Sequence, residues 1–142
     1  MERKFEEMMA SAGDIGETLR LQFEAEHARN MAALRRVWDE AKPNSSVVAD
    51  LSALYHVSHD IKGQGGTFDQ PLLTDIAGLL CKLLWRVDKR VLTAKAIEAI
   101  ECHVAALELV TRRNITGRGG PSSAKMIDGL KTIAAAVGQP SD

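Results

Sequence analysis

Apolar residues recur at steps of three and four along most of the chain, the spacing that places them on one face of an α-helix. The pattern predicts a short charged helix near the N-terminus, a long second helix and four more after it. No alternating strand pattern, hairpin signal or fixed repeat is visible. We therefore expect an all-helical protein. The expected helices span about 2–10, 15–42, 46–66, 72–90, 94–114 and 122–137.

Capping residues mark several of these helix starts. Asp14 precedes Glu17 by three positions, the spacing of a capping box, so we expect the second helix to begin here. Ser45 or Ser46 is expected to cap the third helix, and Thr93 the fifth. The stripe that the second helix should bury consists of Ile15, Leu19, Phe23, Leu34, Val37 and Trp38. The polar residues in its middle, expected to be partly exposed, are Glu26, His27 and Asn30.

Helices of this kind bury their apolar faces by packing on one another. We therefore predict an all-α fold in which an antiparallel four-helix bundle carries additional helices at its termini. The bundle is expected over 15–115, after an N-terminal extension over 1–14 that can itself be helical. Residues 116–142 are expected to form a flexible linker, a last helix and a disordered tail. The sequence leaves open whether that last helix packs on the bundle or on a partner.

Composition narrows the class of protein further. The 142 residues fit one domain, and with 4% aromatic residues the core must be filled largely by aliphatic side chains. The net charge is −1 and charges of both signs are interleaved, so we expect no nucleic-acid or membrane-surface binding. No signal peptide or membrane-length apolar run is visible, and Cys81 and Cys102 are interpreted as reduced, buried thiols. These features favour a cytoplasmic protein.

The third expected helix has two faces of different character, because each residue turns the helix by about 100°. One face is expected to be buried, to be extended by Val47 and to continue after the turn at Phe68. The residues of this buried face are Leu51, Leu54, Ser58, Ile61 and Gly65. The residues of the opposite, outward face are Ser52, Tyr55, His56, His59, Lys62, Gly63 and Gly66.

The outward face is suited to carrying a phosphoryl group on His59. A neutral imidazole is a nucleophile near physiological pH and needs no separate base. Lys62, one turn further on, can offset the negative charge that phosphorylation adds. Gly63 and Gly66 each cost about 1 kcal/mol relative to Ala inside a helix, but their missing side chains let another protein approach the ring closely.

The run His59-Asp60-Ile61-Lys62-Gly63-Gln64-Gly65-Gly66 resembles the signature of histidine-containing phosphotransfer (HPt) domains. In that family the motif lies on one helix of a four-helix bundle, followed by a short turn and a Leu-rich helix. Thr67–Pro71 and Leu72–Leu84 fit that continuation. The resemblance is compatible with most of the chain, but only 59–66 is specific to the family.

The resemblance implies that His59 is the phosphoacceptor and that Lys62 and Gly63 support the phosphoryl group. Two features depart from the family pattern. Gln64 stands where Ser or Ala is usual, which bears on the phosphate contacts, and Asp69 stands in a turn that tends to contain Gly. The residues expected to contact a docked partner are Tyr55, His56, Gln64, Gly66 and Phe68.

The function implied is that of a carrier in a two-component phosphorelay. The expected partners are the receiver domains of response regulators and hybrid histidine kinases, which exchange the phosphoryl group between an aspartate and His59. No cofactor is expected on this chain, because Mg²⁺ would belong to the receiver. The glycines at 63–66 and 117–120 fit no Walker pattern, so no autonomous kinase activity is expected.

Other classes of function were weighed against this one. His56 and His59 have the spacing of two metal ligands, but no neighbouring side chain completes a set and Lys62 opposes a cation, so we expect no metal. His27 and His103 stand in no motif and are expected to be structural or exposed. A helical module that regulates a kinase or response regulator by binding alone remains an alternative. So does a dimeric phosphotransferase hub, although we expect a monomer.

Overall fold

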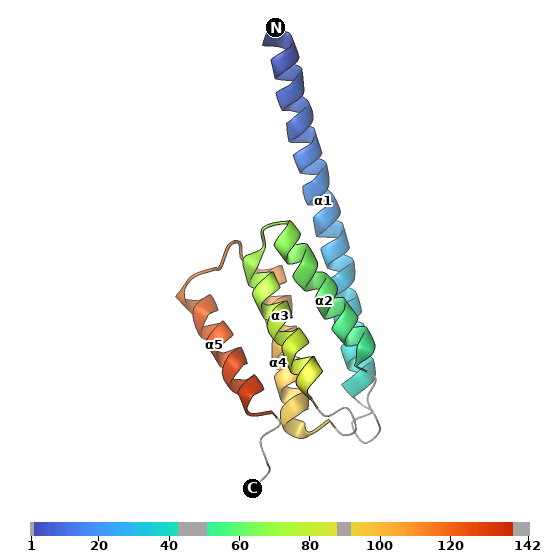
Figure 1. The fold of residues 1–142 in the computed structure, drawn as a ribbon, viewed down its shortest axis with the longest axis vertical. Coiled ribbons are helices and arrows are strands. Elements are labelled where there is room, and N and C mark those ends of the chain that lie inside the picture. The colour runs from blue at the N-terminus through green and yellow to red at the C-terminus, as the bar shows by residue number, and fades with distance from the viewer. Residues whose placement is uncertain (1, 43–50, 88–91, 138–142) are drawn as a thin grey trace.

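The computed structural model describes residues 2–42, 51–87 and 92–137, and within these ranges the chain is helical with no strand (Figure 1). The prediction of an all-helical protein is confirmed. The described helices are α1 (Glu2–Ala41), α2 (Ser52–Thr67), α3 (Pro71–Arg86), α4 (Ala94–Arg112) and α5 (Pro121–Ala135). No helix in this part of the chain is both long and apolar enough to cross a membrane.

The first helix differs from the prediction, because α1 is one helix of 40 residues and not two. The capping box at Asp14 and Glu17 does not begin a helix. A capping box stabilises a helix terminus only where something else ends the helix. Residues 8–12, Met-Met-Ala-Ser-Ala, contain good helix formers and no proline, so the helical backbone continues through Asp14. The proposed caps at Ser45 and Ser46 lie outside the described residues, and α2 begins at Ser52.

The two halves of α1 have different surroundings. Leu34 and Trp38 are fully buried against the other helices, as predicted. Ile15 and Leu19 are exposed, so the prediction that they join the core is wrong. Figure 1 shows the reason: the N-terminal part of α1 projects past the ends of the helices beside it. His27 is buried, although the polar middle of the stripe was expected to be partly exposed.

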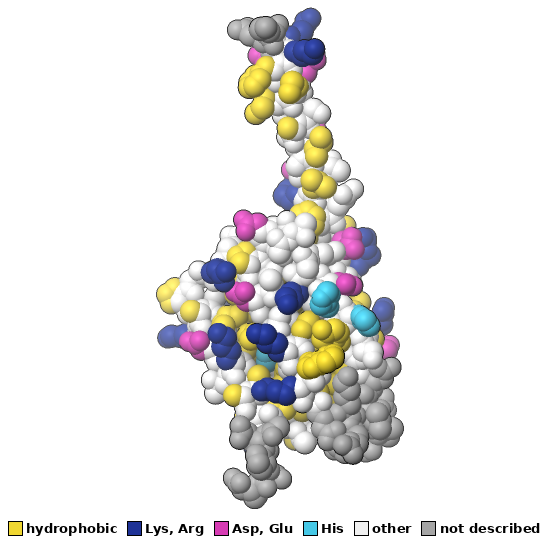
Figure 2. Space-filling view, in the orientation of Figure 1, with side chains coloured by type: hydrophobic (Ala, Val, Ile, Leu, Met, Phe, Trp, Pro, Cys, Tyr) yellow, Lys and Arg dark blue, Asp and Glu magenta, His cyan; other side chains and the backbone are white. Residues whose placement is uncertain are grey.

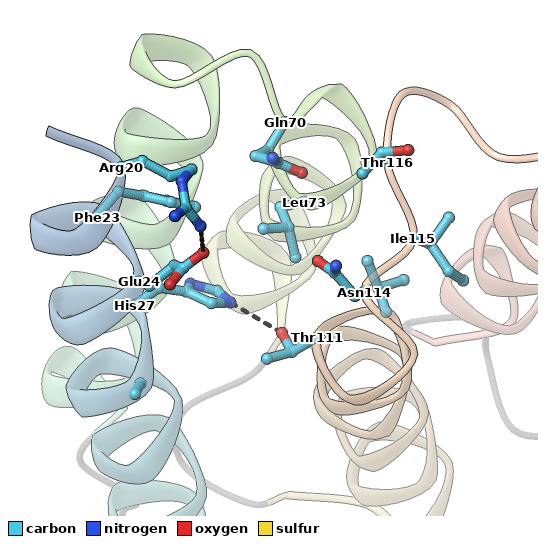
Figure 3. Close-up of a pocket in the computed structure, with 12 residues that line it drawn as sticks. Arg20, Phe23, Glu24, His27, Gln70, Leu73, Thr111, Asn114, Ile115 and Thr116 are labelled. Carbon is cyan, nitrogen blue, oxygen red and sulfur yellow. Dashed lines mark hydrogen bonds and ion pairs between the residues drawn. The ribbon is translucent and has the colours of Figure 1, made fainter. Parts of the chain in front are cut away.

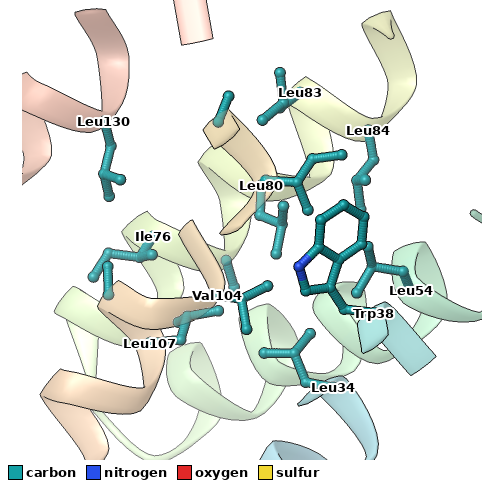
Figure 4. Packing of buried hydrophobic residues seen from close by; sticks show 14 of the residues in the cluster. Leu34, Trp38, Leu54, Ile76, Leu80, Leu83, Leu84, Val104, Leu107 and Leu130 are labelled. Atoms are coloured by element: carbon teal, nitrogen blue, oxygen red, sulfur yellow. The ribbon is translucent and has the colours of Figure 1, made fainter. Parts of the chain in front are cut away.

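The core lies where the second half of α1 meets α2, α3 and α4. Trp38 reaches into a layer of leucine and valine side chains contributed by these helices (Figure 4). Each fully buried aliphatic side chain contributes roughly 1.5–3 kcal/mol to folding. The residues labelled in that view are Leu34, Trp38, Leu54, Ile76, Leu80, Leu83, Leu84, Val104, Leu107 and Leu130.

The last helix packs on the body of the protein, which answers the question left open by the sequence. Helix α5 contacts α3 and α4, and its Leu130 is buried. Arg86 at the end of α3 donates a hydrogen bond to the carbonyl of Ala134 on α5. Pro121 provides a favourable first residue for α5. Before it, Gly117 and Gly119 have φ of 61° and 70°, a conformation that glycine adopts readily.

An ion-pair cluster fastens α1 to α4. The Arg35 guanidinium donates to both carboxylate oxygens of Glu101, at 2.9 Å each, and to Glu108 at 2.6 and 3.1 Å. Lys42 adds a contact of 3.2 Å to Glu101. The hydrogen bonds that Arg35 donates to Glu108 and Glu101 raise the pKa of Arg35, and the bond from Arg35 lowers the pKa of Glu101. The cluster fixes the register of α1 on α4.

The remaining helix boundaries agree closely with the sequence pattern. Helix α2 ends at Thr67 and α3 begins at Pro71, close to the predicted turn. The Thr93 side chain caps α4 by accepting a hydrogen bond from the Ala96 amide at 3.1 Å, as predicted. The fourth predicted helix ends earlier than the predicted residue 90, because α3 stops at Arg86 and the backbone at Val87 is extended (φ −67°, ψ 147°). The predicted disordered tail lies outside the described residues. Asp69 in the α2–α3 turn has φ of 56°, the left-handed conformation for which glycine is better suited.

Candidate functional site

The two faces predicted for α2 are confirmed. Leu54, Ser58, Ile61 and Gly65 are buried, and the Ser58 hydroxyl donates to the Leu54 carbonyl at 2.7 Å. The outward side chains form what we call the acceptor face. Its members are Tyr55, His56, His59, Lys62, Gly63 and Gly66, of which Tyr55 is half-buried and the others are exposed. The imidazole of His59 therefore faces a surface that another protein can reach.

Aromatic rings border His59 on the side towards α3. The Tyr55 ring stacks on His59 with the ring centroids 6.2 Å apart and the planes at 24°. Tyr55 also lies 6.2 Å from the ring of Trp85, which stands on α3. Trp85 is 77% exposed, the most exposed of the large apolar side chains in the described residues. A hollow of about 250 Å³ separates the two helices here, lined by Leu51, Ser52, Tyr55, His56, Leu84 and Trp85.

The sequence analysis did not single out Trp85, because the motif drew attention to 59–66 and the Leu-rich run ended at Leu84. A signal was present: Leu80, Leu83, Leu84 and Val87 define the buried side of α3, and position 85 falls outside their spacing. A tryptophan held at an exposed position of an otherwise Leu-rich helix indicates a contact surface.

Lys62 lies along the surface of α3 rather than standing free. A methyl group built at Gly78 of α3 would lie 3.7 Å from Cε of Lys62, so Gly78 leaves room for the lysine side chain. The charge of Lys62 reaches as far as Cys81, where it partly offsets the rise in the pKa that burial causes for this thiol.

Lysines from three helices gather around a second hollow beside the acceptor face. This hollow, of about 370 Å³, receives Lys62 from α2, Lys82 from α3 and Lys131 from α5. Figure 2 shows histidine, hydrophobic and basic side chains side by side on this surface of the protein. We call the three residues the lysine cluster. Asp75 lines the same hollow and pairs with Arg118 at 2.6 Å, so the lysines leave an excess of positive charge beside the acceptor face, although the whole chain is close to neutral.

The glycines of the motif have different surroundings. A methyl group added at Gly63 would meet no atom within 4 Å, and one added at Gly66 would only touch Thr74 Oγ1 at 4.0 Å. At Gly65 it would lie 2.5 Å from Thr74 Oγ1 and 3.1 Å from the Gln70 carbonyl. Packing therefore requires glycine at 65, whereas no contact among the described residues requires it at 63.

Two of the predicted contact residues lie towards α1, away from the acceptor face. The Gln64 side-chain oxygen accepts a hydrogen bond from Asn30 Nδ2 at 3.0 Å. The Phe68 ring stacks on Phe23 with centroids 4.9 Å apart, and Phe23 in turn stacks on His27 at 5.5 Å. The structure therefore brings Tyr55, His56 and Gly66 together with His59 but places Gln64 and Phe68 in contacts with α1.

A third hollow, of about 490 Å³, lies at the end of the helices where α1 begins to project (Figure 3). His27 reaches across it and its Nε2 lies 2.8 Å from Thr111 Oγ1 on α4. Burial lowers the pKa of His27. The imidazole is thus a structural link between α1 and α4, which agrees with one of the two roles expected for it.

The other chemical candidates take simple roles in the structure. Cys81 and Cys102 are both free thiols, the first buried as expected and the second only half-buried. Within residues 2–42, 51–87 and 92–137, no group of three or more His, Cys, Asp or Glu side chains is arranged to hold a metal ion. No protein-family model, curated protein or solved structure matches this chain.

Proposed function

We propose that this chain is a histidine phosphotransfer protein of a two-component phosphorelay. It would accept a phosphoryl group on His59 from a receiver-domain aspartate and pass it to another receiver. The observation that carries the proposal is the composition of the acceptor face: an exposed imidazole, a glycine at 63 that no internal contact requires, and Lys62 beside them. A protein that only needed a docking surface would have no use for these three together.

The arrangement of the helices also supports this proposal. Helix α1 contacts α2 and α4, and α3 contacts the same two helices, the set of contacts expected of an antiparallel four-helix bundle. In this interpretation α5 is an addition to the bundle. The bundle holds α2 by its buried face and leaves His59 on the outside, where a receiver can dock.

The proposed transfer needs little chemistry from this chain. A ring nitrogen of His59 attacks the phosphorus of a receiver aspartyl phosphate in line, the nitrogen–phosphorus bond forms, and the aspartate leaves as a carboxylate. Lys62 offsets the charge on the phosphoryl oxygens. The receiver supplies Mg²⁺ and the acidic residues that bind it. Such relays operate in the cytoplasm, where we expect this protein.

The test is transfer from a phosphorylated receiver to the wild-type chain, to His59→Gln and to His56→Gln. His56 is the matched control because it is exposed on the same face of α2, one turn away. We expect an acid-labile, base-stable label on the wild type and on His56→Gln, and none on His59→Gln.

The other outcomes are equally informative. If several receivers bind the wild type but none labels it, the chain is a docking module and the carrier function is wrong. If the label persists on His59→Gln and disappears from His56→Gln, the acceptor is the neighbouring imidazole.

A further inference from the structure

The N-terminal half of α1 carries an apolar stripe that nothing in the described chain covers. Phe5, Met8, Ile15 and Leu19 are 64%, 65%, 58% and 46% exposed. This part of the helix projects away from the rest of the molecule (Figures 1 and 2). An exposed helix that contains Gly13 and Gly16 has little to hold it in helical form by itself. The stripe therefore needs a partner.

The spacing of the stripe is that of a helix–helix seam. Its members are Phe5, Met8, Ala12, Ile15 and Leu19, at steps of three, four, three and four. These steps form the a and d positions of consecutive heptads, the pattern by which one helix packs on another over its full length. The alternation of three- and four-residue steps is nearly the same whether it is followed from Phe5 or from Leu19. A pattern of this kind can pair with a copy of itself across a two-fold axis.

We propose that the stripe is covered by the same stripe of a second copy of this chain, in antiparallel orientation. In this register Phe5 packs beside Leu19 of the second copy, Met8 beside Ile15, and the two Ala12 residues meet at the two-fold axis. Gly16 flanks the seam beside Ile15, and its missing side chain lets a second helix approach closely there.

The direction of pairing follows from where the body of the protein lies. Phe23, one turn after Leu19, continues the line of the stripe and packs on Phe68 at the end of α2. The stripe and the body therefore lie on the same side of α1. Parallel pairing would bring the two bodies together on that side, whereas antiparallel pairing places them at opposite ends of the seam.

The hollow at the foot of the projecting helix supports this arrangement. It is lined by Phe23 and His27 on the line of the stripe, and by Gln70 and Asn114 from the end of the body (Figure 3). The first turn of an antiparallel second copy would end there. The hollow thus lies where the seam would meet the body.

A membrane surface is a poorer partner for the stripe. Residues 3–20 contain Glu6, Glu7, Asp14 and Glu17 against Arg3, Lys4 and Arg20, so their polar side carries a slight excess of negative charge. Helices that lie on membranes usually carry lysine and arginine there, because biological membranes are anionic. The charge pattern favours a protein partner.

The test is sedimentation equilibrium of the full chain over a concentration series, for the wild type, Leu19→Glu and Leu21→Glu. Leu21 is the matched control: it is 52% exposed and lies two residues on, turned by about 200° to the far side of the helix. We expect the wild type and Leu21→Glu to reach twice the chain mass of 15.4 kDa. In Leu19→Glu we expect the dissociation constant to rise by about tenfold or more.

Orientation is tested by mixing Phe5→Cys with Leu19→Cys under oxidising conditions. Antiparallel pairing predicts a disulfide between the two variants, beyond any background from Cys81 and Cys102 in the wild type. Disulfides that form only within each variant would overturn the antiparallel orientation.

Three outcomes would overturn the proposal itself. One is a wild type that stays monomeric at every concentration, and another is a dimer that Leu19→Glu leaves intact. The third is a monomer whose stripe binds phosphatidylserine vesicles, with binding lost in Leu19→Glu, since this would make a membrane the partner. None of these depends on whether His59 carries a phosphoryl group.

Discussion

Gly63 and Gly65 lie two positions apart on α2, and the space around them differs completely. Gly65 is buried against the start of α3, where Thr74 and the Gln70 carbonyl leave no room for a methyl group. Gly63 faces outward into open space. Glycine weakens a helix at both positions, but only at Gly65 does the interior of the protein explain it. At Gly63 no contact within the described residues explains it, and the proposed docking of a receiver would.

This contrast leads to a prediction for Gly63→Ala. The added methyl group meets no atom of the chain and improves the helix, so the free energy of unfolding should rise by about 0.5–1 kcal/mol. Phosphoryl transfer should nevertheless slow by roughly tenfold, because the methyl group holds the receiver away from His59. Denaturant unfolding and transfer kinetics on the same preparation measure the two effects.

Gly65→Ala is the comparison for that experiment. It should lower the free energy of unfolding, since Thr74 and the backbone of the turn must move to admit the methyl group. Transfer by Gly63→Ala at the wild-type rate would mean that access to His59 does not depend on this glycine.

His103 makes a prediction about pH. It is fully buried on α4, with Nδ1 2.6 Å from the Ala99 carbonyl and Nε2 without a hydrogen-bond partner among the described residues. Burial lowers its pKa, and the Ala99 carbonyl offsets part of that effect. The unfolded chain therefore protonates His103 more readily than the folded chain does. Neutral His103 stabilises the fold above about pH 6.5, and this contribution is lost as the pH falls towards the folded pKa.

Replacing His103 with leucine should reduce that pH dependence. At pH 8 the free energy of unfolding should stay within about 1 kcal/mol of the wild type, because the variant loses one hydrogen bond but also an unpaired buried nitrogen. Between pH 7 and 5 the stability should fall less steeply, with the remaining slope due in part to His27, whose pKa burial also lowers. Denaturant unfolding over this pH range measures it. An unchanged slope would assign the effect to another group.

At the scale of helices, α2 and α3 together form the surface around His59. Tyr55 on α2 links the imidazole to Trp85 on α3 through ring contacts of 6.2 Å each. An exposed tryptophan at the edge of a hollow is the type of residue that dominates binding energy at protein interfaces. The two helices thus offer an apolar anchor on one side of His59, and Lys62 and Lys82 on the other.

Trp85→Ala should therefore weaken receiver binding far more than it weakens the fold. We expect receiver affinity to fall by about tenfold or more, and the free energy of unfolding to change by less than about 1 kcal/mol. Titration calorimetry with a receiver and denaturant unfolding give the two values. Leu21→Ala, which removes an exposed apolar side chain far from α3, should leave affinity unchanged. Equal affinities for Trp85→Ala and the wild type would remove this residue from the interface.

Most of the helices could be predicted because their apolar spacing and the Thr93 cap act locally. The predictions of burial failed where the outcome depends on what lies beside a helix. Ile15 and Leu19 are spaced by four residues like Leu34 and Trp38, but none of the helices that the structure describes extends far enough to cover them. Periodicity identifies the face of a helix that seeks a partner, and not whether the chain supplies one.

The same distinction applies to the candidate site. The position of His59 on the outward face of α2 followed from the spacing of its own helix. The contribution of Trp85 and of Lys131 did not, because it depends on how α3 and α5 are placed against α2. Gln64 and Phe68 were predicted from their closeness to His59 in sequence, and both instead contact α1.

At the scale of the whole molecule, charge is distributed unevenly although the net charge is only −1. Acidic residues help to fasten α1 to α4 through Glu101 and Glu108, while α5 brings Lys131 to the hollow that Lys62 and Lys82 also line. Helix α5 therefore serves the proposed function by completing the lysine cluster. A receiver presents an acidic pocket around its aspartate, so this positive surface would guide it towards His59.

Lys131→Glu tests this role for α5. Lys131 is exposed, so the substitution should leave the fold intact. Transfer from a phosphorylated receiver should slow by about threefold to tenfold at low salt, chiefly through slower association. The difference from the wild type should shrink as salt is added, because screening weakens the attraction between separated surface charges.

Lys125→Glu makes the same change of charge on the same helix but outside the hollow. If only long-range attraction mattered, transfer to the two variants would slow by the same factor, because they have the same net charge. A local role for the lysine cluster requires Lys131→Glu to be clearly slower than Lys125→Glu at low salt, with the two rates converging at high salt. If the two variants behave alike at every salt concentration, α5 contributes only its share of net charge, and the docking surface ends at α3.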